Sequence, residues 1–135
     1  MKGFFFLITF TAVGAHAQSD WTHFSTTDQG KTKSYIDYSK IKRDSYGANT
    51  YTAWWRAVAT PPQTVGGKRF SYSLALYRVD CDKATLAEQA IYYYTVAGKL
   101  VSKDDRPLQA TVAVPESTGE TFVNAICSAA KIRGI

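Results

Sequence analysis

Apolar and polar residues alternate along most of the chain in short runs, which is the pattern of a β-rich domain. Residues 50–59, TYTAWWRAVA, are rich in β-branched and aromatic side chains and predict a strand. The following TPPQTVGGKR, residues 60–69, is expected to interrupt it because it holds two prolines and two glycines. Residues 70–81, FSYSLALYRVDC, alternate large and small side chains at a period of two and predict a second long strand.

Shorter runs bounded by turn residues predict the remaining strands. Three consecutive tyrosines favour an extended chain over residues 87–96, although ATLAEQA at 84–90 also fits the start of a helix. Ala97 and Gly98 then mark a hairpin turn. The other predicted strands are residues 21–24, 34–38, 99–103 and 110–114.

The end of the chain has a different period. Ser117 followed three residues later by Glu120 is the arrangement of a capping box at a helix start. Phe122, Ile126 and then Ala129 or Ala130 recur at spacings of three and four and form one apolar stripe. Basic residues near the C-terminus suit the negative end of the helix dipole. We therefore predict one C-terminal helix of about 13 residues.

The chain opens with the features of a secretory signal peptide. Lys2 precedes an uncharged apolar run, and Ala15-His16-Ala17 offers the small residues that signal peptidase requires. This run of roughly 12 residues is too short to cross a bilayer, and no transmembrane helix is expected in the mature chain. We expect residues 1–17 to be removed and residues 18–135 to form one exported domain, periplasmic or secreted.

Export changes the meaning of the two cysteines, Cys81 and Cys127. Thiols oxidise outside the cytoplasm, and two cysteines permit a single pairing, so we expect a Cys81–Cys127 disulfide. The bond would join the end of the second long strand to the predicted helix. The fold class that follows is α+β: an antiparallel sheet of about six strands, with one C-terminal helix packed on one face and stapled by the disulfide.

The residue inventory gives little support for catalysis or for metal binding. His23 is the single histidine after residue 17, so neither a nucleophile–base pair nor a zinc ligand set is evident. Asp80 and Asp82, at the end of a strand, are expected to be solvated charges. We therefore predict no enzyme activity, no catalytic residue, no metal site and no cofactor.

Charge narrows the class of partner. The formal net charge is +5 and becomes +4 if residues 1–17 are removed, because Lys2 is then the only charged side chain lost. The basic residues are scattered rather than arranged in a stripe, so we predict no nucleic-acid binding. A mildly basic exported protein favours anionic surfaces such as lipid headgroups or acidic glycoproteins.

The aromatic residues supply the candidate binding surface. Trp54 and Trp55 are adjacent in a strand, so their side chains must point to opposite faces of the sheet. One helix covers one face, so one of the two faces solvent, a loop or a partner. We expect that tryptophan to lie with Tyr92, Tyr93 and Tyr94 in a homodimer or ligand interface, although partial burial under loops is the simpler alternative.

Three ordered segments carry a resemblance to a known family. They are YIDYSKI at 35–41, YSLALYRVDCDKATLAEQAIYYY at 72–94 and VPESTGETFVNAIC at 114–127. In their order and spacing they resemble the surface-adhesin protein E family of Gram-negative bacteria. The resemblance implies a curved antiparallel sheet with a packed C-terminal helix, and it implies a homodimer. In the founding adhesin it also implies binding to host vitronectin, laminin and plasminogen.

Two features of the sequence depart from the family's adhesin. That adhesin is a lipoprotein, whereas Ala17-Gln18 stands at the expected cleavage site here, so no lipid anchor is expected. The ligand-binding strand of that adhesin is basic. The corresponding segment here has fewer basic residues and keeps Lys68, Arg69 and Arg78. Two functions follow: an adhesin-like module that binds host matrix or serum glycoproteins, or a periplasmic structural or envelope-associated protein of the same fold that has no host ligand.

Overall fold

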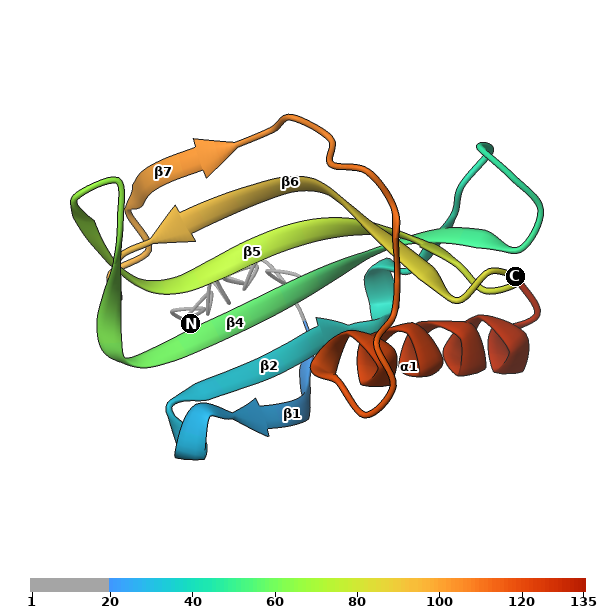
Figure 1. Ribbon diagram of the computed structural model, residues 1–135, viewed down its shortest axis with the longest axis horizontal. Coiled ribbons are helices and arrows are strands. Elements are labelled where there is room, and N and C mark those ends of the chain that lie inside the picture. Colours follow the sequence, from blue (N-terminus) through green and yellow to red (C-terminus); the bar gives the residue numbers. More distant parts are fainter. Residues whose placement is uncertain (1–19) are drawn as a thin grey trace, which may run out of the picture.

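The computed structural model describes residues 20–135, and the predicted signal peptide lies outside the described residues. The described part forms one antiparallel sheet with a single α-helix packed against one face (Figure 1). The α+β class predicted from the sequence is confirmed. The helix crosses one end of the sheet, while a long hairpin extends away from it at the other end (Figure 1).

The sheet has eight strands, of which six form its main path in the order β1-β2-β4-β5-β6-β7. The two others are short: β3 pairs with β4, and β8 pairs with β6. The element bounds are β1 Trp21–Thr27, β2 Thr32–Asp37, β3 Lys42–Arg43, β4 Thr50–Val65, β5 Lys68–Asp80, β6 Thr85–Tyr94, β7 Leu100–Asp104, β8 Thr111–Val112 and α1 Thr118–Arg133. The segment 84–90, for which a helix was the alternative, belongs to strand β6 apart from Ala84.

Strand β4 does not end at the two prolines, so the predicted interruption over residues 60–69 is wrong. The register between β4 and β5 shifts between Val58 and Gln63. Pro61 and Pro62 lie within this bulge, where the N–H that proline lacks is not needed for pairing with β5. The chain turns only at Gly66 and Gly67, whose φ angles of 53° and 76° are those a two-residue hairpin turn requires.

Helix α1 begins where the sequence predicts and is longer than predicted, with 16 residues. The Ser117 side chain accepts a hydrogen bond of 3.2 Å from the backbone N–H of Glu120. The carboxylate of Glu120 reaches back to the backbone N–H of Glu116, one residue before the position of an ideal capping box. Gly134 closes the helix in the left-handed conformation, with φ of 69°.

The hydrophobic core lies between α1 and the sheet. Phe122 and Ile126 from the helix are fully buried, as are Ile36 and Val79 from the sheet. Phe122 stacks on Trp55 with ring centroids 5.0 Å apart. The apolar stripe predicted for the helix is therefore the stripe that packs on the sheet.

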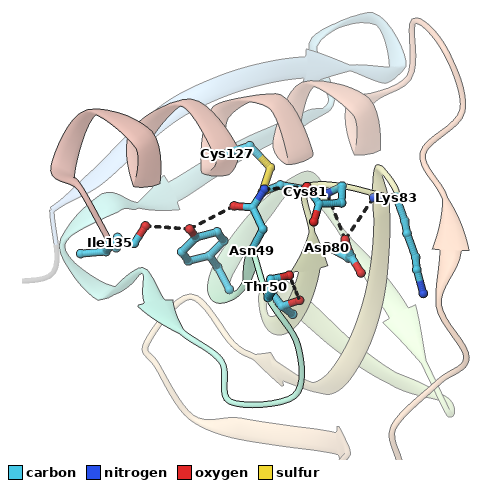
Figure 2. Close-up of a disulfide and its surroundings, with 10 residues drawn as sticks. Asn49, Thr50, Asp80, Cys81, Lys83, Cys127 and Ile135 are labelled. Carbon is cyan, nitrogen blue, oxygen red and sulfur yellow. Dashed lines mark hydrogen bonds between the residues drawn. A yellow bond between two sulfur atoms is a disulfide. The ribbon is translucent and has the colours of Figure 1, made fainter.

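The predicted disulfide is present between Cys81 and Cys127, with Cα atoms 5.8 Å apart (Figure 2). Cys81 directly follows β5, and its backbone N–H donates to the Asn49 carbonyl. Asp80 accepts hydrogen bonds from the backbone N–H groups of Asp82 and Lys83 and so shapes this turn. The disulfide therefore joins the helix to the ordered turn between β5 and β6.

Candidate functional site: the aromatic face of the sheet

The two adjacent tryptophans of β4 lie on opposite faces of the sheet. Trp55 contacts the core residues Phe122, Phe24 and Tyr77, so it faces the helix. Trp54 points away from the helix, and its ring lies 6.3 Å from that of Tyr92. Among residues 20–135, α1 is the only helix longer than one turn. Trp54 is thus the outward tryptophan that the alternation of the strand requires.

The three consecutive tyrosines of β6 divide between the faces in the same way. Tyr94 stacks on Tyr72 with centroids 5.1 Å apart, on the same face as Trp54 and Tyr92. Tyr93 pairs across the ladder with Ser73, on the helix side of the sheet. Burial, with Glu88 and Asp104 nearby, raises the pKa of Tyr93. Only Tyr92 and Tyr94 of the predicted tyrosine set therefore share a face with Trp54.

A cation that the sequence reasoning did not select lies at the centre of this face. The guanidinium of Arg56 lies 4.6 Å from the centroid of the Tyr72 ring and 5.9 Å from that of Trp21. Its Nε is buried and has no hydrogen-bond partner. Arg56 takes part in neither the Arg78–Asp44 nor the Arg106–Asp104 ion pair, and no carboxylate within residues 20–135 forms an ion pair with it. The aromatic rings stabilise this charge and leave it unpaired.

A shallow cavity of about 210 Å³ lies beside Arg56, lined by Trp21, Tyr35 and Val58 together with the arginine. Tyr35 lies directly opposite Arg56 in the ladder between β2 and β4. We use the name aromatic face for the surface formed by seven side chains that share this side of the sheet. They are Trp21, Tyr35, Trp54, Arg56, Tyr72, Tyr92 and Tyr94.

The three basic residues predicted for binding do not form one group, because Arg78 lies apart from Lys68 and Arg69. Arg78 is on the same side as the aromatic face, but its Nε donates to Asp44 and its guanidinium lies 4.4 Å from the ring centroid of Tyr46. This hydrogen bond lowers the pKa of Asp44. Lys68 and Arg69 are exposed at the tip of the β4–β5 hairpin. Arg78 is thus already occupied, whereas the two hairpin residues are open to a partner.

The carboxylates serve local structure. Asp37 is fully buried, and its side chain accepts a hydrogen bond from the backbone N–H of Ser39 that turns the chain after β2. Asp104 is held by Arg106, whose hydrogen bond lowers the pKa of that carboxyl to about 2. Residues 20–135 contain no group of three or more His, Cys, Asp or Glu side chains placed to hold a metal ion. The same part of the chain contains no helix long and apolar enough to span a membrane.

Comparison with known families identifies most of the chain. The model of the family described as surface-adhesin protein E matches residues 21–128, which includes every strand and most of α1. No curated protein matches the sequence.

Solved structures share the fold at low sequence identity. Crystal form II of Haemophilus influenzae protein E is 12% identical, with a TM-score of 0.60 over 78% of this chain and 87% of that chain. The selenomethionine form of the same protein is 12% identical, with a TM-score of 0.61 over 84% of this chain and 89% of that chain. Protein E from non-typeable Haemophilus influenzae is 10% identical, with a TM-score of 0.59 over 87% of this chain and 82% of that chain. At these identities the likeness concerns the fold.

Proposed function

Because the chain belongs to the surface-adhesin protein E family, we propose that it is an exported, non-enzymatic module that binds a host matrix or serum protein through its aromatic face. Large aromatic side chains and arginine are the residues that most often anchor protein interfaces. Seven such side chains share one side of this sheet. The partner class is a protein with an acidic patch.

One observation carries this proposal: Arg56 is half-buried between aromatic rings and has no carboxylate among residues 20–135. Removing a charge from water without a partner costs free energy. An incoming carboxylate would offset that cost, and the low polarity beside Tyr72 and Trp21 would strengthen the contact. The aromatic rings around it would supply the apolar contact area of the interface core.

Lys68 and Arg69 would act at the rim of this interface. Both are exposed at the hairpin tip, so salt screens their attraction for an acidic partner. Changes there should alter the association rate and its salt dependence more than the lifetime of the complex.

The experiment is binding of the exported protein to immobilised vitronectin, laminin and plasminogen, with purified serum albumin as an acidic control. Trp54→Ala and Arg56→Gln should each weaken binding by about 10-fold or more, since such anchors commonly contribute at least 1–2 kcal/mol. Lys68→Ala with Arg69→Ala should weaken binding chiefly at low salt. Trp55→Ala is the matched control, because it removes a neighbouring ring that faces the helix.

Sedimentation velocity on the same proteins shows whether the aromatic face mediates self-association rather than binding of a host protein. If Trp54→Ala abolishes self-association and no host protein binds, the aromatic face is a homodimer interface. That result would contradict the proposal and favour an envelope-associated protein of the same fold. Equal binding by wild type, Trp54→Ala and Arg56→Gln would contradict it as well.

A further inference from the structure

A second cavity lies on the opposite side of the sheet, next to the first residue of α1. Its volume is about 230 Å³. Trp55, Tyr77 and Ile91 supply its larger lining side chains, and small side chains of β2, β4 and β5 supply the rest of the sheet surface within it. The full lining is Thr27, Thr32, Ser34, Trp55, Ala57, Ser73, Ala75, Tyr77, Ile91 and Thr118. We call it the helix-side cavity.

Two hydroxyls in this lining belong to residues with little exposed surface and have no protein partner within residues 20–135. Ser34 is 2% exposed and Ser73 is 8% exposed. Within residues 20–135 neither side chain makes a hydrogen bond, and the buried Nε1–H of Trp55 has no acceptor either. Of these three groups only the Trp55 Nε1–H is closed to solvent, whereas the Ser34 and Ser73 oxygens are open to the cavity, so these two hydroxyls are available to pair with a ligand.

The lining is uncharged. None of its residues is acidic, basic or a histidine. Tyr77 is the titratable side chain; a phenol is neutral at physiological pH, and burial, together with the neighbouring Glu88, raises its pKa still further. A phosphate, a carboxylate or a metal ion would lose its hydration here without gaining an opposite charge. The cavity therefore suits a neutral ligand.

The hydrogen-bonding groups specify the ligand further. A serine hydroxyl both donates and accepts a hydrogen bond. A ligand that carries several hydroxyls matches the two serines, because each of its hydroxyls also donates and accepts. An extended peptide fits less well, since the cavity lies over interior strands whose backbone groups are already paired within the sheet.

The size of the cavity limits the ligand to one ring. At about 30 Å³ per molecule it would hold about seven waters, and it is smaller than the roughly 300–1,000 Å³ of pockets that enclose drug-sized ligands. The methyl groups of Ala57 and Ala75 can contact the C–H groups of a sugar ring, while the serines bind its hydroxyls. We propose that the helix-side cavity binds a single neutral sugar ring, either as a free sugar or as the terminal unit of a glycan.

Protein-observed NMR tests the proposal on the isotope-labelled exported protein. The probes are glucose, galactose, mannose and N-acetylglucosamine, each free and as the terminal unit of a neutral oligosaccharide. We expect at least one to produce saturable shifts at Ser34, Ser73 and the Trp55 indole N–H. A larger response to the oligosaccharide than to the free sugar would assign the site to glycans, and equal responses would assign it to free sugars.

Variants distinguish sugar binding in the helix-side cavity from a nonspecific effect of the sugar on the protein. Ser34→Ala and Ser73→Ala should each weaken binding about fivefold, the typical loss of one hydrogen bond. Ala57→Leu should abolish binding by filling the cavity. Ser71→Ala, on the same strand as Ser73 but outside the lining, should bind as wild type does. Trp54→Ala and Arg56→Gln should also leave sugar binding unchanged. The sugar proposal is therefore tested independently of the proposal for the aromatic face.

Three results would overturn the proposal. The first is the absence of saturable shifts at these residues with any of the sugars. The second is unchanged affinity in Ser34→Ala and Ser73→Ala, with native spectra for both. The third is binding of only acidic sugars such as sialic acid, lost in high salt, which would contradict a neutral site. If Ala57→Leu does not fold, the two serine variants still decide the question.

Discussion

Arg56 and Arg78 lie on the same side of the sheet and carry the same charge in different surroundings. Arg78 donates to Asp44, whose side chain is 13% exposed, and this hydrogen bond connects the segment after β3 to β5. Arg56 has aromatic rings in place of a carboxylate. A salt bridge of the first kind stabilises the fold, whereas a cation of the second kind is available to a ligand.

The Asp44–Arg78 pair should make stability depend on pH. Its hydrogen bond lowers the pKa of Asp44 in the folded protein below the ordinary value of 3.8. The stabilisation is therefore complete above pH 3.8 and is lost as the pH falls through the lowered folded pKa. Asp44→Asn should cost about 1 kcal/mol at neutral pH. That difference from wild type should vanish in strong acid.

Urea unfolding of both proteins from pH 7 into strong acid measures this difference. Because the other carboxylates titrate alike in both proteins, they cancel in the comparison. Asparagine can still accept the hydrogen bond that the Tyr46 backbone N–H donates to Asp44, so a difference that does not change with pH would show that the charge of Asp44 does not stabilise the fold.

The residue alternation of β4 could have identified Arg56 from the sequence. It follows Trp54 by two positions, so both side chains must share a face of the strand. The contacts to Tyr72 and Trp21 could not have been predicted in this way, because they depend on the register of β4 with its neighbours and on the path of β1. Which tryptophan faces the helix likewise depends on where the helix packs.

At the scale of elements, local sequence signals predicted the helix start and the disulfide correctly. Ser117 caps α1, and Cys81 reaches Cys127, because these features depend on nearby residues or on a single available pairing. The length of β4 was predicted wrongly, because Pro61 and Pro62 favour an interruption whereas the strand continues through both. A β-bulge, which tertiary pairing creates, absorbs both prolines within the strand.

The cap of α1 can be tested directly. Ser117→Ala removes the acceptor for the Glu120 N–H and should lower the free energy of unfolding by about 1 kcal/mol. Ser128→Ala is the control, because Ser128 is exposed within the same helix and should change stability by less than about 0.5 kcal/mol. Urea unfolding at neutral pH measures both. Equal effects would mean that the cap contributes nothing beyond helix propensity.

At the scale of the whole molecule, the two faces of the sheet differ in chemistry. One face presents aromatic rings around Arg56, whose cation forms no ion pair with any residue from 20 to 135. The other is covered by α1 at one end and holds an uncharged, hydroxyl-lined cavity beside the helix start. The two proposed sites thus differ in the class of ligand and are separated by the thickness of the sheet.

The disulfide also determines how the molecule would carry a mechanical load. Tension on the C-terminus would peel the last residues of α1 as far as Cys127 and then pass through the sulfur atoms into the end of β5 (Figure 2). Strands β6, β7 and β8 lie between the two cysteines in the sequence, so the tension would bypass them.

Stretching the protein by its termini in optical tweezers should therefore release a shorter chain when the disulfide is intact. Cys81 and Cys127 are 46 positions apart, so reduction should lengthen the fully unfolded chain by about 160 Å at roughly 3.6 Å per residue. Cys127→Ser should give the longer value without reductant. An extension that reduction leaves unchanged would mean that the purified protein holds no such bond. A cell-surface protein built in this way would keep three of its eight strands out of the force path while flow pulls on a bound partner.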